Sequence, residues 1–401
     1  MKCYRNFSEI VTLEKAYHKD GRKLLPEDLS IIKNGSIVFD DAKIIWIGED
    51  SSLPNEYKNI PSINYTGHTL TPEVVDSHTH LVFAGDRSQE YTMRLNGADY
   101  EAIAKSGGGI LSTMEQTITA SEDELYTSAL QRILNIHSYG VGTIEIKSGY
   151  GLTLESERKI SNVIQKLKDH FKDKIQILNT YMAAHAIPKS SKSSSEYIQK
   201  IVLPLMSELA SSIDFVDVFQ EVGYFNEDDT KAIFDHALKL GLKLKIHADE
   251  FNDNKGAILA TKYSAISADH LLCTSLDGAE ALSKSNTVAT LLPGTAFFLG
   301  KPLANARMFL DQGCKVALAS DYNPGSCHCD NLLMIASISA KTLKLNIAEL
   351  WCGITLNAAH ALDLKNQGAL IPELQPRFSI FKCERVDLIT YNWGKSFSIN
   401  F

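Results

Sequence analysis

Two histidines separated by one residue are the first pair in this chain whose types and spacing could do chemistry. They follow a short apolar run in the stretch Val74-Val75-Asp76-Ser77-His78-Thr79-His80. Because side chains alternate between the two faces of a strand, His78 and His80 should leave the backbone on the same side. The spacing therefore predicts two imidazole nitrogens that converge on one point, as metal ligands do. For this pair alone, an ordinary strand end remains the alternative.

Other residues able to do chemistry recur where apolar segments end. These are Lys147, His185, Glu221, His247, His270 and Asp321. A lone histidine at such a place is more often structural, but a series of them at successive strand ends indicates one shared site. In a barrel of parallel strands, the active site is built at the carboxyl ends of the strands.

Three imidazoles and one carboxylate form the donor set that we expect to bind a metal, from His78, His80, His247 and Asp321. This set suits Zn²⁺ or iron with a position left for water. Such a metal can lower the pKa of bound water to about 7, which makes hydroxide available for hydrolysis. The set differs from the two-histidine, one-carboxylate triad of iron oxygenases, so redox chemistry is not favoured.

Two further residues are candidates for catalysis. Glu250 lies three residues after His247, close enough to contact metal-bound water without being a ligand. We expect Glu250 to carry a proton from water to a leaving nitrogen, with a helix-capping carboxylate as the alternative. His270 ends the next predicted strand and could polarise a carbonyl or hydrogen-bond the hydroxide. A purely orienting role for His270 stays open.

Apolar strands alternate with amphipathic helices through the middle of the chain, which argues for βα units and a parallel sheet. Helices are expected, for example, at 154–170, 228–240 and 304–312. We expect strands near Val74 and at 142–147, 175–184, 215–220, 242–247, 265–270, 287–292 and 316–320. About eight strands is the number that closes a (β/α)8 TIM-type barrel.

Both ends of the chain have the texture of short strands and turns. Strands are expected at 29–32, 36–39, 43–48, 377–382 and 386–391, with a hairpin turn at Asn34-Gly35. We therefore predict a smaller β-sandwich domain built from residues 1–71 and 365–401. Residues 72–364 would form the barrel.

Composition limits the partners and the compartment. The 401 residues are 44% hydrophobic and 22% charged, as in ordinary globular proteins. A net charge of -8 gives no basic surplus for nucleic acid, and no apolar run suits a membrane span or a secretory signal. Seven scattered cysteines do not suggest a disulfide framework, so we expect a cytoplasmic protein. Cys327-His328-Cys329 lacks the second ligand pair of a structural zinc site.

Several stretches resemble the amidohydrolase superfamily and, within it, the imidazolonepropionase family of histidine degradation. The segment 72–80 is similar to the superfamily's opening motif, and His247, His270 and Asp321 match its later positions. The resemblance to the narrower family is carried by the stretches 78–87, 106–113, 147–152, 247–251 and 320–326. It runs from about residue 72 to residue 364, and both terminal segments fit the family's β domain.

The resemblance implies one Zn²⁺ or Fe³⁺ per subunit and hydrolysis of a cyclic amide. The implied reaction converts 4-imidazolone-5-propanoate to N-formimidoyl-L-glutamate, by attack of metal-bound hydroxide on the ring carbonyl. Glu250 and His270 would be catalytic, and a homodimer is a family expectation. Substrate contacts are implied for Arg87, Tyr150, His185, Glu250, Asn323, Gly325 and Ser326. Arg87 suits the propanoate carboxylate, since its planar fork can hold two oxygens.

The sequence departs from the family pattern at two places and leaves three rival functions open. Glu73 and Ser77 stand where the family usually has Gly and often has Pro, which affects only local loop geometry. An aminohydrolase of the purine or pyrimidine deaminase kind shares the metal motifs, although the loops at 148–151 and 323–325 speak against it. A two-metal cyclic amidase would need a carboxylated Lys147. A metal-free scaffold would be credible only if ligands were missing.

Overall fold

Eight parallel strands, hydrogen-bonded in chain order from β6 to β13, form the centre of the larger part of the protein. The computed structural model describes residues 1–97 and 108–399, so the first two residues of the stretch 106–113 lie outside the described residues. The strands are β6 Val74–Asp76, β7 Val141–Lys147, β8 Gln176–Ala184, β9 Phe215–Gln220, β10 Lys243–Ala248, β11 Ser267–His270, β12 Val288–Leu291 and β13 Val316–Leu318. The prediction of a (β/α)8 barrel is confirmed.

The barrel closes between its first and last strands at their carboxyl ends. Thr79 and Tyr322 form a parallel bridge there. The His80 amide donates to the Tyr322 carbonyl at 2.9 Å, and the Asp321 amide donates to the His78 carbonyl at 3.0 Å. The closing hydrogen bonds therefore belong to the backbone of the predicted metal ligands, which fixes how these segments lie relative to each other.

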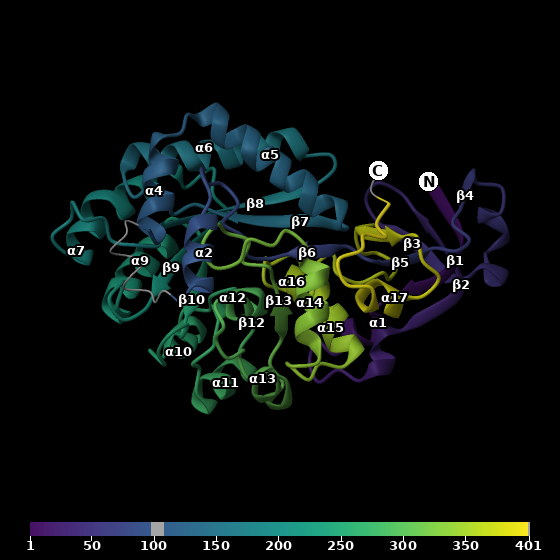
Figure 1. Cartoon of the computed structure of the whole chain (residues 1–401). Coiled ribbons are helices and arrows are strands. Elements are labelled where there is room, and N and C mark those ends of the chain that lie inside the picture. Colours follow the sequence, from purple (N-terminus) through teal and green to yellow (C-terminus); the bar gives the residue numbers. More distant parts are fainter. Residues whose placement is uncertain (98–107, 400–401) are drawn as a thin grey trace.

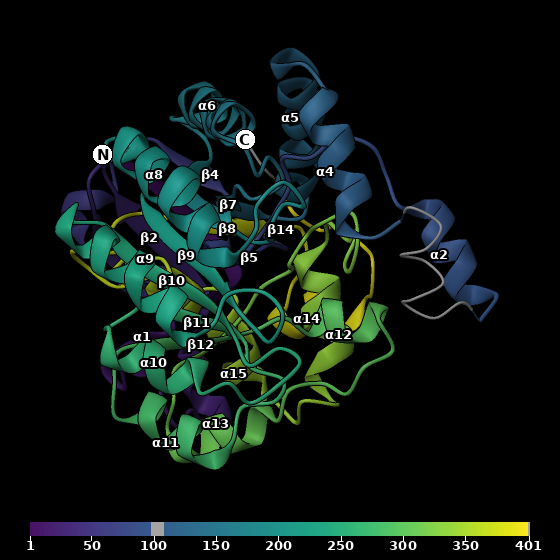
Figure 2. The same cartoon turned by 90° about the vertical axis from the view of Figure 1, so that its left-hand side faces the viewer.

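Helices follow the strands and lie outside the barrel, as Figure 2 shows for α8, α9, α10 and α11 against the strands behind them. The helix α6 (Leu154–Phe171) shows the pattern: Ile160, Val163, Ile164 and Leu167 are buried at helical spacing. The other helices of the barrel are α2 Ser88–Leu95, α4 Ile110–Thr119, α5 Glu122–Ser138, α7 Ser194–Tyr197, α8 Leu203–Leu209, α9 Glu227–Lys239, α10 Gly256–Lys262, α11 Leu276–Ser283, α12 Pro293–Phe298, α13 Ala306–Gln312, α14 Leu332–Ala340, α15 Ile347–Gly353 and α16 Leu356–His360, with one π-helical turn at Ile198–Val202.

Both ends of the chain build a second, mixed sheet beside the barrel, on the right of Figure 1. Its strands are β1 Lys2–Val11, β2 Ile31–Phe39, β3 Ile44–Glu49, β4 Ser62–Asn64, β5 Thr69–Pro72 and β14 Phe378–Phe381. Short helical turns at Glu14–His18 (α1), Pro26–Leu29, Asp50–Ser52 and Asn55–Tyr57 connect them. The sheet has its own apolar core, which includes Phe7, Ile10, Ile37, Leu70 and Ile380. The domain boundaries at 71/72 and 364/365 stay a proposal.

The predicted hairpin turn at Asn34-Gly35 is wrong, because β2 runs through it. Asn34 has a φ of 48°, and the register against β1 shifts nearby, so the residue forms an irregularity within a strand. A Cβ on Gly35 would lie 2.6 Å from Ile10 Cδ1, so the glycine lets the Ile10 side chain pack closely against this strand. The chain reverses instead after β2, where the Asp40 amide donates to the Lys43 carbonyl at 3.1 Å.

The predicted strand at 386–391 is also wrong, because Val386–Tyr391 forms helix α17. Val386 and Ile389 are buried on one side of this short helix. The Glu9 carboxylate accepts a hydrogen bond from the Val386 amide at 2.8 Å and so satisfies a free donor of the first turn. Periodicity cannot separate helix from strand in so short an apolar run.

All seven cysteines lie in the described part of the chain and are free thiols. Within residues 1–97 and 108–399, no helix combines the length and the apolar character that a bilayer span requires.

Glu73 joins the barrel to the terminal sheet. Its carboxylate is buried and accepts hydrogen bonds from Arg377 Nη2 at 2.9 Å and from Thr143 Oγ1 at 2.6 Å. Arg377 Nη2 also donates to the Gly142 carbonyl at 3.0 Å. Glu73, which stands where the family usually has glycine, therefore links β7 to the segment that leads into β14.

Replacing Glu73 by Ala should therefore destabilise the protein. The change leaves the partly buried Arg377 guanidinium without its carboxylate, which should cost about 1–3 kcal/mol. Urea unfolding monitored by circular dichroism measures it. Glu373→Ala, which breaks an exposed pair with Lys43, is the control and should shift the midpoint far less. Equal shifts in the two variants would contradict the assigned role of Glu73.

Candidate metal centre and active site

The four predicted metal ligands meet at the carboxyl ends of the barrel strands. His78 and His80 follow β6, His247 lies on β10 and Asp321 follows β13. The Nε2 atom of His80 lies 3.3 Å from that of His78 and 3.3 Å from that of His247. Asp321 Oδ1 lies 3.6 Å and 3.7 Å from Nε2 of His78 and of His80. All four side chains are buried.

The other ring nitrogen of two of these histidines faces a carboxylate. His78 Nδ1 lies 2.7 Å from Asp269, and His247 Nδ1 lies 3.1 Å from Asp217. A carboxylate at Nδ1 holds the ring proton there, so the Nε2 lone pair points to the centre. Lone pairs 3.3 Å apart repel each other unless a cation lies between them. Tetrahedral nitrogen ligands of zinc are about 3.4 Å apart, so this donor set fits a metal ion.

Burial favours the neutral form of the His78 and His80 imidazoles, which is the form that binds a metal. Desolvation is the largest cause that lowers the pKa of His78 and of His80 well below the usual range. Burial also raises the pKa of Asp321 to about 6, although Thr295 opposes this by donating a hydrogen bond to its carboxylate at 2.5 Å. A cation beside Asp321 would favour its ionised form.

A layer of buried charges lies directly beneath the histidines, and sequence reasoning missed most of it. Lys147 Nζ donates to Glu145 and to Asp217 at 2.7 Å each, and lies 3.7 Å from Asp269. Lys245 Nζ lies 3.7 Å from both Glu145 and Asp269. The sequence did contain a signal for this layer. Charged residues occur inside otherwise apolar barrel strands, whereas barrel interiors are usually filled by bulky apolar side chains.

The position of Lys147 argues against the two-metal alternative. Burial opposes its charge, yet Asp217, Glu145 and Asp269 together raise the pKa of Lys147 above its ordinary value. Carboxylation of lysine requires the neutral amine, whereas this side chain is held as an ammonium between carboxylates. Burial opposes the charge of Asp217, but His247 and Lys147 together hold the pKa of Asp217 well below its usual value, which keeps it an acceptor for His247.

Glu250 and His270 lie next to the ligand cluster. His270 Nε2 is 3.7 Å from Glu250 Oε2, and the His270 ring centroid is 5.0 Å from that of His247. Burial, followed by the charges of Asp321 and Glu221, raises the pKa of Glu250 well above its usual value. A buried carboxyl group whose proton is retained at higher pH is suited to proton transfer.

Three residues around this cluster have left-handed backbones although none is glycine. The φ angles are 52° at Asp249, 78° at His270 and 51° at Asp321. Such conformations typically cost about 1–3 kcal/mol each and persist only where the surroundings impose them. Asp249 shows how: its carboxylate accepts from the Gly256 amide at 2.9 Å and from Thr274 at 2.9 Å. Strained backbone thus occurs where the strands deliver the candidate catalytic groups.

The structure brings Tyr150 and His185 beside the ligands. The His185 ring stacks on that of His80, with centroids 4.9 Å apart and planes inclined by 19°. Tyr150 lies against His185, with ring centroids 5.4 Å apart. Burial is the main cause that lowers the pKa of His185 to about 3. Gly149, with a φ of 121°, permits the close approach, since a Cβ there would meet the Met182 carbonyl oxygen at 2.7 Å.

The predicted substrate residues after β13 form a tight loop. Asn323 Oδ1 accepts from the amides of Gly325 and Ser326 at 2.8 Å each. Asn323 Nδ2 donates to the Asp321 carbonyl at 2.6 Å and to Ser326 Oγ at 2.9 Å. In this structure the side chains of Asn323 and Ser326 shape their own loop, and any substrate contact by them stays a proposal.

Arg87 lies at the start of α2 and is paired with Glu90. Its Nε and Nη2 atoms donate to Glu90 Oε2 at 2.9 Å and 2.7 Å, and the two side chains are only 12% and 9% exposed. Arg87 lines a cavity of about 710 Å³ that opens beside the loop after β13. The other lining residues are Asp86, Ser88, Tyr91, Phe297, Phe298, Pro324 and His328.

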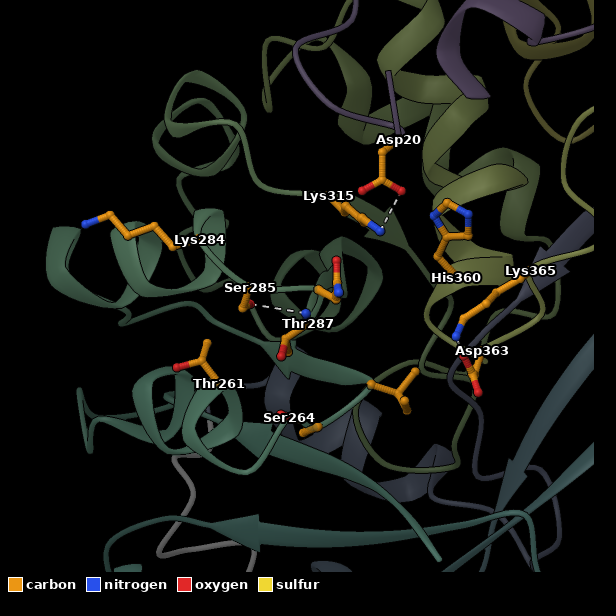
Figure 3. A pocket seen from close by; sticks show the side chains of 13 residues that line it. Asp20, Thr261, Ser264, Lys284, Ser285, Thr287, Lys315, His360, Asp363 and Lys365 are labelled. Carbon is orange, nitrogen blue, oxygen red and sulfur yellow. Dashed lines mark hydrogen bonds and ion pairs between the residues drawn. The ribbon is translucent and has the colours of Figure 1, made fainter. Parts of the chain in front are cut away.

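Figure 3 shows a second cavity, of about 690 Å³, whose lining residues place it at the amino ends of the barrel strands. Residues that precede β11, β12 and β13 line it, among them Ala265, Thr287 and Lys315, and Lys315 pairs with Asp20 at 2.7 Å. None of the predicted site residues lines this cavity. The amino ends of barrel strands usually serve stability, so we do not assign the reaction to it.

Arg132 is a positioning residue for which the sequence offers no local signal. Its Nη1 atom donates to the carbonyls of Leu81 and Phe83 at 2.8 Å each, and its guanidinium lies 3.5 Å from the Phe83 ring centroid. It therefore fixes the segment that follows His80. Only the packing of α5 against that segment brings them together.

Cys327-His328-Cys329 does not form a metal cluster among the described residues, where the candidate clusters are those of the histidines and Asp321. Cys327 is buried, and desolvation raises the pKa of its thiol well above the usual value. His328 packs on Tyr322, with ring centroids 5.2 Å apart.

Solved structures similar to this chain include triazine hydrolases and deaminases, some of them with zinc. A triazine hydrolase variant aligns with a TM-score of 0.72 and 14% identity, over 99% of this chain and 92% of that chain. An adenosine deaminase from Xanthomonas campestris with bound zinc aligns with a TM-score of 0.70 and 12% identity, over 99% and 90%. At such identities the likeness shows the fold alone.

Curated relatives are much closer in sequence, although no protein-family model matches the chain. The imidazolonepropionase of Staphylococcus saprophyticus is 38% identical over 368 residues, which cover 92% of this chain and 88% of that protein. The imidazolonepropionase of Paracoccus denitrificans is 39% identical over 371 residues, with 91% and 92% covered. Identity at this level over nearly the whole chain, together with the ligand geometry at the barrel mouth, places this protein in the imidazolonepropionase family.

Proposed function

We propose that this protein hydrolyses 4-imidazolone-5-propanoate to N-formimidoyl-L-glutamate, with one Zn²⁺ or Fe³⁺ per subunit held by His78, His80, His247 and Asp321. The observation that carries the proposal is the convergence of three Nε2 atoms beside Asp321, with spacings of 3.3 Å between neighbouring nitrogens. Family membership supports the substrate. A metal ion at this site would supply Lewis acidity, which makes water more acidic and a ring carbonyl more electrophilic.

Two residues beside the candidate ligands are proposed to assist different steps of the reaction. Water adds to the ring carbonyl carbon, the ring C–N bond breaks, and the departing nitrogen takes up a proton. Glu250 is proposed to accept the proton of the attacking water and to return it to this nitrogen. His270, 3.7 Å from Glu250, is proposed to hydrogen-bond the oxygen on the carbonyl carbon. The product is a carboxylate on an open chain.

Substrate orientation is assigned to residues around the opening. Arg87 would bind the propanoate carboxylate with charge-assisted hydrogen bonds. Tyr150 and His185 would contact the ring beside His80, because both rings already pack there. The loop of Asn323, Gly325 and Ser326 would close the side next to Asp321. Binding energy from the remote carboxylate would then place the ring over the reacting groups.

Deamination is the nearest alternative, since guanine and adenosine deaminases are among the solved structures of similar fold. The family assignment favours ring opening. An assay that follows ammonia release from purines separates the two activities, because imidazolone hydrolysis releases none.

Cytoplasmic location and a homodimer complete the proposal. Both rest on membership of the imidazolonepropionase family. Sedimentation of the purified protein tests the second.

The metal assignment predicts the behaviour of His247→Ala. The variant should fold, with sharply reduced metal content and little activity, because one of three converging nitrogens is lost. Elemental analysis of the purified protein measures the metal. Joint replacement of Cys327 and Cys329 by Ser is the control and should leave the metal in place. Full metal occupancy in His247→Ala would contradict the assignment of His247 as a metal ligand.

The proton-transfer assignment predicts the behaviour of Glu250→Gln. Glutamine keeps the shape and the hydrogen-bonding capacity but removes the base, so kcat should fall by roughly 10²–10⁴ while the metal stays bound. Steady-state kinetics across a pH series provides the measurement. A near-normal kcat with an unchanged pH profile would mean that Glu250 only orders its loop.

The carboxylate assignment predicts the behaviour of Arg87→Ala. An arginine contact made in both the ground state and the transition state should appear mainly in KM, so KM should rise at least tenfold with full metal content. Arg87→Lys should recover only part of this, because an ammonium cannot form two parallel hydrogen bonds. Normal kinetics in Arg87→Ala would place the anion elsewhere, and Arg94 would be tested next.

A further inference from the structure

The guanidinium of Arg87 occupies space that only a glycine leaves free. A Cβ placed on Gly325 would lie 1.9 Å from Arg87 Nη1, 2.7 Å from Cζ and 3.4 Å from Nε. These are the three nearest atoms, and all of them belong to Arg87. The backbone of Gly325 is not among the positive-φ glycines, so its conformation would accept any residue. The requirement at position 325 is therefore room for Arg87.

Glu90 holds the opposite edge of the same guanidinium. One carboxylate oxygen, Oε2, accepts both Nε–H and Nη2–H of Arg87. The other oxygen, Oε1, accepts the amide of Gly109 at 2.7 Å, where helix α4 begins. Both acceptors of Glu90 are thus used, and a glutamine could replace only one of them. A second arginine lies against the same glycine, since Arg94 Nη1 is 3.3 Å from the Gly325 carbonyl.

This arrangement leaves one edge of Arg87 for a ligand. The guanidinium carries five N–H donors, of which Glu90 takes two. The Nη1 group lies against Gly325, four residues after the candidate ligand Asp321, and donates no hydrogen bond to the residues that the structure describes. An Nη1/Nη2 edge has the spacing that a carboxylate accepts with two parallel hydrogen bonds.

We propose that Glu90 and Gly325 are positioning residues that determine selectivity for substrates with a terminal carboxylate. Gly325 provides the space, and Glu90 orients the fork so that its free edge is presented beside the loop after β13. The proposal rests on the proposed function, since it concerns the anionic end of the same substrate. It also gives Gly325 a role that requires no contact with the substrate.

Binding of a matched pair of probes tests the proposal without turnover. Imidazole-4-propanoate carries the carboxylate, whereas imidazole-4-propanamide has the same shape without the charge. Titration calorimetry on the metal-loaded protein gives the ratio of their dissociation constants. Wild type should prefer the acid at least tenfold, and Glu90→Gln and Gly325→Ala should each reduce this preference at least fivefold. Wild type without a preference, or variants that keep it, would overturn the proposal.

Combination with Arg87→Ala separates positioning from a general structural effect. If Glu90 and Gly325 act through Arg87, then Glu90→Gln and Gly325→Ala should change acid binding less than twofold once Arg87 is alanine. In that background the added methyl of Gly325→Ala also meets no guanidinium. Effects that persist at full size in the double variants would mean that the two residues serve the loop alone, and would overturn the proposal.

Control measurements distinguish a failure of this proposal from a failure of the proposed function. Glu280→Gln removes an exposed carboxylate that pairs with Lys284 at 3.8 Å, and it should leave both dissociation constants unchanged. Should Gly325→Ala fail to fold, Glu90→Gln still decides the proposal. Hydrolysis of imidazolone propanoate by wild type is measured in parallel: its absence counts against the proposed function, whereas the probe ratios judge the two positioning residues.

Discussion

Compensation of buried charge is the constraint on which the rest of the site depends. Lys147, enclosed in the barrel, would be costly as an isolated ammonium, but Glu145 and Asp217 accept from it at 2.7 Å each. The same carboxylate layer then serves the histidines above it, because Asp217 and Asp269 face their Nδ1 atoms. Removal of any one charge would leave another unpaired. This layer explains how His78 and His247 can present their Nε2 atoms to one point inside an apolar fold.

The hydrogen bonds that close the barrel and the residues with a strained backbone both lie at the carboxyl ends of the strands. The bridge between Thr79 and Tyr322 joins the first and last strands between the ligand segments, so the sheet cannot close without setting the ligand positions. The left-handed residues His270 and Asp321 lie there too, and the Asp321 amide donates to the His78 carbonyl. Apolar packing outside the strands stabilises the barrel. This stability offsets the cost of the strained backbone at the carboxyl ends of the strands.

The part of the barrel mouth around Arg87 is arranged differently. There the groups are near the surface and belong to segments after β6 and β13, which are distant in sequence. Arg87 is oriented by Glu90, three residues away at the start of α2, and it is accommodated by Gly325, which is distant in sequence but follows the neighbouring strand β13. One local contact, with Glu90, and one long-range steric allowance, at Gly325, thus define the position of the Arg87 guanidinium.

The sequence by itself determined the alternation of strands and helices, the His-x-His pair and the recurrence of polar residues at strand ends, because these depend on local periodicity and residue type. It also indicated the family, through stretches whose order along the chain matched. Local pattern failed at Asn34-Gly35 and at 386–391, where packing against Ile10 and Glu9 decided the conformation. Only the tertiary structure decided which carboxylates hold the histidines, that Lys147 is an ammonium in an ion-pair layer, and that Gly325 makes room for Arg87. These are contacts between residues far apart in the chain, and their energies depend on burial and distance, which no local pattern contains.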